Sequence, residues 1–565
     1  MITRICTILM LFFTLPILGQ LNYGLTFKSR EYTSFIKKPK TKFKDSTSAR
    51  SYLREFQLTA ISKGYLLASI DSIKFSSNNA IVHFFLGEKF TDAKIGATKE
   101  EFSFIGKNAK VNEKFFAQVP FRPKELASIL KKINAAYLNN GFPFCSVSLI
   151  TRKLDKGQIA ADLNIEQGPF LKWIKINIRG DSSISRKYLS NLLNIKVGEK
   201  YNEAITKKIS TRIKQVPFLK EIKPAEFLYT KQGVELFVYI ESIPISSVNG
   251  VIGFQPDPIS SKLTVTGELS LKLQNMLKRG ELLDVQWQSI RAETQSLDAH
   301  LNYPFLFNTP FGIDGTFNLY KRDTSFIELN SSIGIEYYLD AGTVIKAFYK
   351  NITSSILSGG QSNPIYTSLG SAKSNNYGLS FYKKQIDYIP NPTRGYSVTI
   401  SASLGNRVSQ INDTTLQMES STSRGYSLVN LYFPITKRHV IRFSNLTEFY
   451  SAPDIFQNEL NRFGGLTNQR GFDEDELLST TKSSSTLEYR FLLDKDSHVF
   501  AFYDQTWYEN NTGNYYKDTP YGFGVGFSFS TNFGVFSISY ALGKQFENPV
   551  LLNNSKVHFG YIVYF

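Results

Sequence analysis

The sequence predicts a transmembrane antiparallel β-barrel of about sixteen strands, preceded by tandem small α+β modules. The last segment, Lys556–Phe565, alternates apolar with other side chains and ends on an aromatic residue. An alternating segment of about ten residues with an aromatic end has the size and pattern of a barrel strand. Similar segments recur from about Ser246 onward, whereas a helix-containing pattern repeats before that point.

The composition of the 565-residue chain agrees with this fold class. It holds 46 Phe and 31 Tyr against 3 Trp, and its mean hydropathy of −0.19 is too polar for a helical membrane protein. After the N-terminus no apolar run reaches the roughly 18 residues that a membrane helix needs. In a barrel wall only alternate residues touch lipid, so many aromatic residues without long apolar runs are expected.

The N-terminus, residues 1–19, is predicted to be a secretory signal. A short basic start, an apolar stretch from Ile8 to Leu18 and a small residue at Gly19 fit that pattern. The alternative, a buried helix, is disfavoured by the early position and short length. Cys6 would leave with the signal, so Cys145 would remain alone without an intramolecular disulfide. Export without disulfides favours a Gram-negative envelope protein.

The formal charge is +17, with lysines concentrated in the first half, for instance in 37–44. A basic surface suits nucleic acid, anionic lipid or acidic protein. No segment resembles a nucleic-acid-binding module, so we expect a solvated basic face near anionic head groups and no nucleic-acid partner.

Residues 169–243 show the repeated module most clearly. Trp173–Gly180 alternates as a strand, Ser185–Asn194 and Asn202–Val216 have helical spacing, and Val234–Ile240 alternates again. With a strand before Val234, the predicted order is β-α-α-β-β.

Two earlier copies are predicted at a spacing of about 75 to 80 residues. In 88–168 the helix Pro123–Asn139 is followed by strands at Phe144–Thr151 and Gln158–Glu166. In 20–87 the helix Ala49–Ser62 precedes strands at Leu66–Phe75 and Ala80–Leu86. Little sequence is left for a first strand and helix in this copy, so we expect it to be partial or irregular.

A β-α-α-β-β module repeated in front of a barrel resembles the POTRA domain. The resemblance implies a sheet with an exposed edge strand, to which an unfolded chain adds through main-chain hydrogen bonds. The alternative is a rigid spacer.

Residues 246–565 are predicted to form the barrel. Tyr521–Ser530 places aromatic and aliphatic residues on one face and Gly or Ser on the other. Around Leu487 the apolar positions alternate with Glu488 and Arg490, which we expect to face the lumen. At roughly 20 residues per strand with its turn, this length gives about sixteen strands.

The segment Arg462–Phe472 lies before the Leu487 strand and contains Arg-Gly-Phe. It resembles the loop of the BamA/TamA-like assembly and secretion superfamily, the bacterial surface antigen type, which carries Arg-Gly-Phe or Arg-Gly-Tyr. Two other copies, at Arg394 and Arg424, show that the tripeptide also arises elsewhere. We choose Arg470 because of the preceding Phe463-Gly464-Gly465 and its distance from the C-terminus.

The resemblance implies that this loop folds back into the lumen, where its arginine meets an acidic residue on a following strand. Asp504 is the matching acid, and its strand parity would also turn two aromatic residues inward. A charge buried in a lumen needs a partner, and aromatic faces add cation–π contacts. The predicted site comprises the loop residues Arg470, Gly471 and Phe472 and the wall residues Asp504, Phe502 and Phe500.

The last strand is similar to the outer-membrane targeting pattern polar-x-Gly-x-x-apolar-x-apolar. His558, Gly560, Val563 and Phe565 fill it in register. The alternative is an ordinary terminal strand. Gly560 would also weaken the seam at which the last strand meets the first, since Gly in a strand packs nothing.

No catalytic constellation is found. The five His are scattered without metal-ligand spacing, and there is no Gly-x-Ser-x-Gly elbow or phosphate loop. We therefore expect no enzymatic activity, no cofactor and no metal.

The resemblance implies an outer-membrane protein with periplasmic modules that inserts or translocates other proteins by β-strand addition without nucleotide. The small number of modules favours a TamA-like accessory or a divergent paralogue. Expected partners are unfolded outer-membrane or secreted clients, outer-membrane lipids and a periplasmic or inner-membrane accessory protein. The alternatives are a two-partner-type secretion pore for a dedicated client and a structural or lipid-handling barrel without insertase activity.

Overall fold

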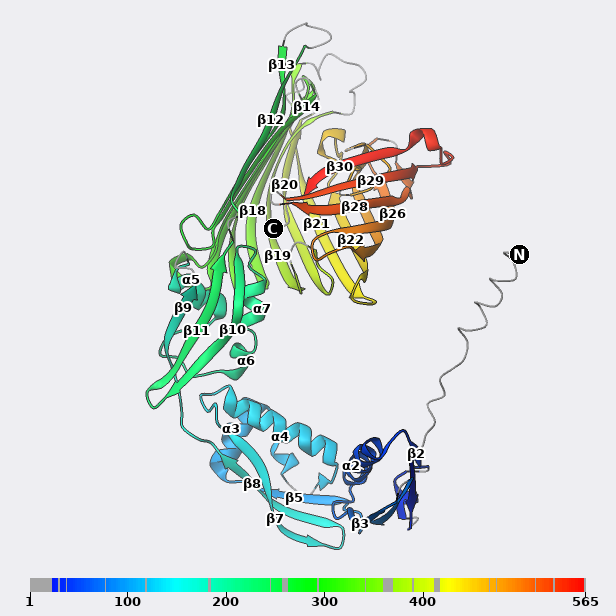
Figure 1. Cartoon of the computed structure of the whole chain (residues 1–565). Coiled ribbons are helices and arrows are strands. Elements are labelled where there is room, and N and C mark those ends of the chain that lie inside the picture. The colour runs from blue at the N-terminus through cyan, green and yellow to red at the C-terminus, as the bar shows by residue number, and fades with distance from the viewer. Residues whose placement is uncertain are drawn as a thin grey trace, which may run out of the picture. The chain divides into compact units, whose positions relative to one another are not determined.

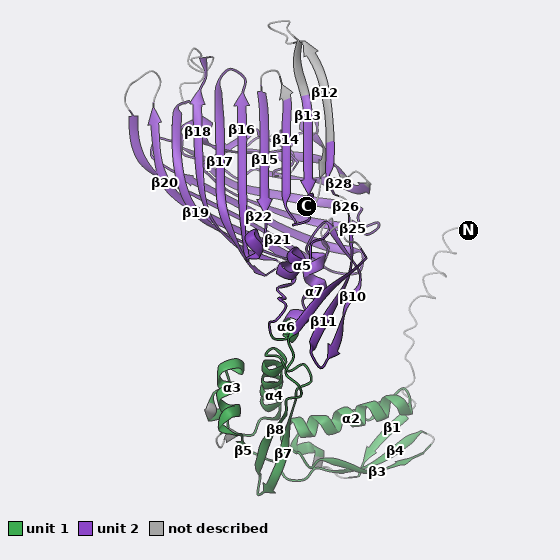
Figure 2. Cartoon of the chain, turned by 90° about the vertical axis from the view of Figure 1, so that its left-hand side faces the viewer, with its two compact units in different colours: residues 1–172, 200–204 green, residues 173–199, 205–565 purple. Residues whose placement is uncertain are grey.

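A computed structural model of the chain describes residues 23–562, apart from gaps at 29–30, 37, 77, 117–118, 181–183, 244, 257–262, 292–293, 341, 359–368, 389–390, 411–416, 467, 474, 514 and 532–533 (Figure 1). The predicted signal, residues 1–19, and the predicted targeting residues Val563 and Phe565 lie outside this range. Two compact units make up the chain, one of residues 1–172 and 200–204 and one of residues 173–199 and 205–565 (Figure 2). The finer module boundaries stay predictions.

The first sheet of the first unit has the strand order β2-β1-β4-β3. A helix packs on it with Leu53 and Phe56 buried, and Asp45 caps this helix by accepting the Ser48 backbone N–H. A single 3₁₀ turn stands where the other two modules have a first α-helix. The elements are β1 (Tyr23–Phe27), η1 (Glu31–Ser34), β2 (Lys42–Phe43), α2 (Ser46–Ser62), β3 (Ser69–Phe75) and β4 (Asn79–Phe85).

The second sheet of this unit has the order β6-β5-β8-β7, with β5 parallel to β8. Two helices pack on it around Ile105, Ile133 and Tyr137, and Cys145 is a free, buried cysteine in the same core. The elements are β5 (Asp92–Gly96), α3 (Lys99–Ala109), η2 (Glu113–Phe115), β6 (Val119–Pro120), α4 (Pro123–Leu138), β7 (Ser146–Asp155) and β8 (Gln158–Glu166).

A third small sheet, in the second unit, has the order β10-β11-β9, with β11 parallel to β9. The single helix predicted over Asn202–Val216 is wrong, because the structure has two shorter helices there. The break follows Ile205 and Thr206, whose branched side chains lower helix propensity. The elements are β9 (Trp173–Gly180), α5 (Arg186–Leu193), α6 (Glu203–Thr206), α7 (Ile209–Lys214), β10 (Leu219–Thr230) and β11 (Gly233–Ser242).

The barrel wall is one antiparallel sheet of 17 strands in the described part of the chain, running in order from β12 to β30 (Figure 2). One of them, β27, has three residues, so the prediction of about sixteen membrane-length strands is confirmed. The wall strands are β12 (Ser247–Pro256), β13 (Leu263–Gln274), β14 (Leu282–Arg291), β15 (Thr294–Tyr303), β16 (Phe311–Arg322), β17 (Phe326–Asp340), β18 (Thr343–Ile356), β19 (Ser371–Ile386), β20 (Gly395–Gln410), β21 (Gln417–Pro434), β22 (His439–Ser451), β25 (Thr481–Leu492), β26 (His498–Asn510), β27 (Tyr516–Asp518), β28 (Tyr521–Thr531), β29 (Gly534–Lys544) and β30 (Lys556–Ile562).

Side chains alternate between the two faces of this wall. On β25, Leu487 and Tyr489 are 52% and 40% exposed, whereas Glu488 and Arg490 are 3% and 5% exposed. The apolar face is therefore the outer one, and the charged face lines the lumen. Among the residues that the structure describes, no helix combines the length and apolarity needed to cross a membrane.

The third small sheet and its helices pack against one end of the barrel, which we call the near end. Tyr188 of α5 lies 5.7 Å from Phe305, ring centre to ring centre. The Ser185 N–H donates to the Lys278 carbonyl, and the Gln215 amide donates to the carbonyl of residue 384. The loop between β22 and β25 starts and ends at the opposite, far end. Short elements outside the wall are η3 (Leu306–Asn308), η5 (Gln457–Glu459), β23 (Asn461–Phe463), β24 (Leu477–Ser479) and η6 (Leu552–Asn554).

Candidate functional site

The candidate site lies inside the barrel, where the loop 452–480 reaches inward-facing positions of the last strands. We call this segment the lumenal loop. Its arginine, Arg470, is 7% exposed, and the wall residues Glu488 and Asp504 that it contacts are 3% and 1% exposed. The site is thus a buried contact between a loop and a wall.

Arg470 binds Asp504 of β26 through one edge of its guanidinium group. Its Nε donates to Asp504 Oδ2 at 2.7 Å, its Nη2 donates to Oδ1 at 2.8 Å, and its backbone N–H donates to Oδ2 at 3.2 Å. The remaining Nη1 donates to Glu488 Oε2 at 2.9 Å. Two-pronged charge-assisted bonds of this kind are among the strongest side-chain contacts and fix orientation as well as distance.

The two carboxylates have further partners that balance their charge. Arg490 Nε donates to Glu488 Oε1 at 2.8 Å, and Arg442 Nη1 lies 3.7 Å from the same oxygen. The Thr486 hydroxyl donates to Asp504 Oδ1 at 2.8 Å. Burying these charges is tolerable only because each is paired and hydrogen-bonded.

Two aromatic rings lie beneath the guanidinium group. The Arg470 Cζ is 3.5 Å from the centre of the Phe502 ring and 5.8 Å from that of Phe500. Both rings are buried on β26, and the closer one adds cation–π attraction to the guanidinium group. Phe472, next in the loop, packs in a separate cluster with Phe463, Leu477 and Tyr508.

Glycines on β28 and β29 make room for the loop backbone. A Cβ on Gly522 would lie 1.9 Å from the Arg470 carbonyl oxygen, and one on Gly543 would lie 2.5 Å from the Gly471 carbonyl oxygen. Gly471 itself has a φ of +94°, a conformation that favours glycine. The Gly alternation of β28 was visible in the sequence, but sequence reasoning did not connect it with this loop.

A second anchor at the beginning of the lumenal loop was missed by sequence reasoning. Arg407 of β20 donates to both carboxylate oxygens of Glu459, at 2.9 Å and 2.7 Å, and Tyr450 also donates to Glu459 at 2.8 Å. Asn458 donates to the Ser354 hydroxyl at 2.7 Å. The loop is therefore fixed at its beginning to β18 and β20 and at its tip to β25 and β26.

The other two Arg-Gly motifs lie outside the lumenal loop. Arg394 follows a turn in which Asp387 accepts the backbone N–H groups of Thr393 and Arg394. Arg424 lies within β21, with its Cζ 3.6 Å from the centre of the Tyr450 ring. Neither arginine forms a described ion pair, whereas Arg470 forms two.

The described part of the predicted targeting strand also reaches the site. The Gly471 N–H donates to His558 Nε2 at 3.1 Å, and Gly560 pairs with Ser537 of β29. The targeting role of this strand stays a prediction.

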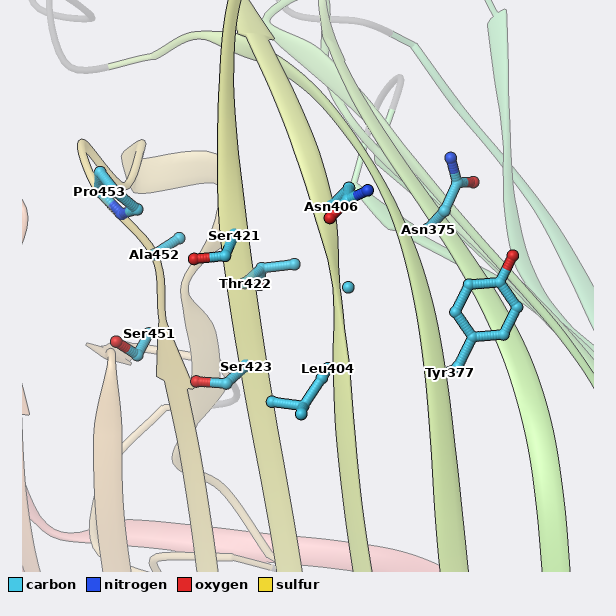
Figure 3. A pocket seen from close by; sticks show the side chains of 11 residues that line it. Asn375, Tyr377, Leu404, Asn406, Ser421, Thr422, Ser423, Ser451, Ala452 and Pro453 are labelled. Atoms are coloured by element: carbon cyan, nitrogen blue, oxygen red, sulfur yellow. The ribbon is translucent and has the colours of Figure 1, made fainter.

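A separate pocket lies on the strands of the barrel wall. This pocket of about 890 Å³ lies on β19 to β22, and its lining is made of amide, hydroxyl and apolar side chains without a charge (Figure 3). In the described ranges, no group of three or more His, Cys, Asp or Glu side chains has the arrangement of a metal site.

Comparison with solved structures finds several similar proteins. CdiB from Acinetobacter baumannii is 14% identical over 83% of this chain and 88% of its own, with a TM-score of 0.51. CdiB from Escherichia coli is 14% identical over 91% of this chain and 98% of its own, with a TM-score of 0.50. A structure of BamA from Haemophilus ducreyi lacking POTRA domains 1–3 is 13% identical over 83% and 98%, with a TM-score of 0.43.

No family model matches the sequence, and no curated protein matches it. At 14% identity the two CdiB structures show the fold, which is that of small α+β modules followed by a β-barrel. The fold that the resemblance to the BamA/TamA-like superfamily implied is therefore confirmed.

Proposed function

We propose that this chain is an outer-membrane protein that inserts or translocates other proteins, in the manner of a TamA-like accessory factor. The observation that carries the proposal is the lumenal loop, whose Arg470 is bound by Asp504 and Glu488 on the inner wall of a barrel that has the third module at its near end. The near end would then face the periplasm and the far end the cell exterior. No nucleotide is needed, because the work consists of exchanging hydrogen bonds.

The modules offer edges at which a client strand adds. In the second sheet β7 is an edge strand, and its Ile150 and Leu154 are exposed. In the third sheet the edge strand β10 spans twelve residues, Leu219–Thr230. An extended chain that adds to such an edge gains main-chain hydrogen bonds without a specific sequence, which suits a factor with many clients.

The barrel seam is the proposed place of insertion. The strands β12 and β30 stand at the two ends of the wall order. In lipid every backbone N–H and C=O needs a partner, so a client strand at this seam would supply the bonds that an opened wall lacks.

A secretion pore for one dedicated client is the second candidate. It is favoured by a polar cavity of about 380 Å³ beneath the lumenal loop, lined among others by Asn430, Ser444, Thr486 and Ser528. A polypeptide in transit needs such polar groups along its path, because its backbone is extended and unpaired.

Depletion of the protein followed by quantitative proteomics of the outer membrane tests these proposals. A decrease in many barrel proteins supports insertion, and loss of one exported protein supports dedicated secretion. An unchanged outer-membrane proteome would contradict both and leave the structural or lipid-handling barrel.

A further inference from the structure

The tip of the lumenal loop contacts the last described strand of the barrel at two points. The Gly471 N–H donates to His558 Nε2 at 3.1 Å, which requires a neutral ring with its proton on Nδ1. Lys556 Nζ lies 2.7 Å from Asp473 Oδ1. Both contacts join residues more than 80 positions apart in the sequence.

These two side chains of β30 face the lumen. His558 pairs across the sheet with Ser539, and Lys556 pairs with Ala541, and both of these β29 residues are fully buried. Val557, which lies between them, faces outward with 69% exposure. The strand therefore turns two polar side chains to the loop and an apolar one to lipid.

The two contacts come directly after the strongest anchor of the loop in the sequence. Gly471 follows Arg470 directly, and Arg470 is held by three hydrogen bonds to Asp504 of β26. Gly471 also lies against Gly543, so it has no room to move toward β29. A displacement of Arg470 from Asp504 would thus carry Gly471 away from His558.

We propose that His558 and Lys556 are positioning residues through which the lumenal loop holds β30 in place at the end of the wall. The Arg470–Asp504 pair then governs the strand indirectly, because seating the arginine presents Gly471 and Asp473 to β30. Withdrawal of the loop tip releases β30 from its lumenal side. This proposal rests on the proposed function in one respect only, namely that a client protein pairs with the released strand.

Hydrogen–deuterium exchange of the mature full-length protein in lipid bilayers, read on peptides that cover 556–562, tests the proposal without any client. In His558→Leu, and separately in Lys556→Met, these amides should exchange about fivefold faster, the ratio expected for the loss of one net hydrogen bond. The heat-modifiable mobility of the barrel in electrophoresis establishes that each variant is folded.

Two further variants separate positioning from general loosening. Val557→Ala changes the same strand on its lipid face and should leave the exchange within twofold of the parent protein. His558→Gln keeps an acceptor at similar reach and should restore slow exchange. If His558→Leu exchanges like the parent, or if Val557→Ala exchanges as fast as His558→Leu, the proposal is wrong.

The link to Arg470 is tested by combining changes. Arg470→Ala should raise exchange in 556–562, and adding His558→Leu should raise it no further, since the loop tip is already withdrawn. If the two changes raise the exchange rate of 556–562 independently, so that their factors multiply in the double variant, the link is wrong. Because no client takes part, a failure here is distinguishable from a failure of the proposed function, which the outer-membrane proteome reports.

Discussion

At the residue scale, the stability of the site depends on how many partners each buried charge has. Arg470 contacts Asp504, Glu488 and the Phe502 ring. Each of the three nitrogens of its guanidinium group donates a hydrogen bond to a carboxylate. Removing one member leaves the others buried without compensation, which costs more than the intact pair contributes. The identity of each residue is therefore tightly constrained.

Two replacements of Arg470 should separate the effect of its charge from the effect of its hydrogen-bond geometry. We expect Arg470→Ala to leave a foldable barrel that has lost activity and about 3–5 kcal/mol of stability, the usual consequence of breaking a buried pair. Arg470→Lys keeps the charge but has no planar fork, so it should recover only part of both. Urea unfolding in lipid and the outer-membrane proteome measure the two effects, and full activity of Arg470→Ala would refute the assignment of this loop.

Burial of Cys145 lowers the expected reactivity of its thiol. Burial in the second module raises the pKa of its thiol to about 11, so it stays un-ionised at pH 8, where a free thiol with a pKa of about 8.5 is partly thiolate. We expect iodoacetamide to alkylate Cys145 in the folded full-length protein much more slowly than after unfolding, as measured by peptide mass spectrometry. Equal rates before and after unfolding would contradict the burial of this side chain.

The same shift has a consequence for stability. A raised pKa in the folded state means that the unfolded state loses its proton first as the pH rises. The contribution of the neutral thiol is thus fully present below about pH 8.5 and declines as the pH rises toward 11. The free energy of unfolding of Cys145→Ala should therefore decline less at alkaline pH than that of the parent protein, because the variant lacks the contribution of the thiol.

At the element scale, alternation in the sequence predicted strands well and long-range contacts less well. The lumenal facing of Glu488 followed from its position between Leu487 and Tyr489, because a strand has a period of two. The helix break after Thr206 was not predicted, since the apolar spacing of that segment continues across it. The anchor between Arg407 and Glu459 left no signal, because many polar residues occupy equivalent inward positions of long strands.

This second anchor predicts that the lumenal loop is held at two independent places. Arg407→Ala should lower stability by about 3–5 kcal/mol, because the Glu459 carboxylate stays buried without its cationic partner. Replacing both residues by Ala should cost less than the two single changes together, and urea unfolding of the four proteins measures this coupling. Strict additivity would show that the pair does not act as a unit.

At the scale of the whole molecule, the sequence predicted the order of parts but not the contacts between the third module and the barrel. Gly280 has a φ of +81°, and a Cβ there would lie 2.2 Å from the Tyr188 ring. Tyr188 in turn lies against Phe305, whose ring centre is 4.8 Å from that of Tyr338. These residues belong to distant segments, and no local pattern marks them as neighbours.

The aromatic contact predicts that the third module is held to the near end by packing. Tyr188→Ala should open a cavity between α5 and the loop of Gly280, and a buried aromatic of this size costs about 3–5 kcal/mol on truncation. Hydrogen–deuterium exchange should rise in α5 and in the loop 275–281 together, while the wall strands around Asp504 stay protected. Tyr188→Phe keeps the ring and should behave like the parent protein. Because the module would then be fixed less firmly relative to the barrel mouth, we expect the proposed client transfer to fall even though both parts are folded. A variant that loses the contact yet keeps full activity would show that insertion does not depend on this joint.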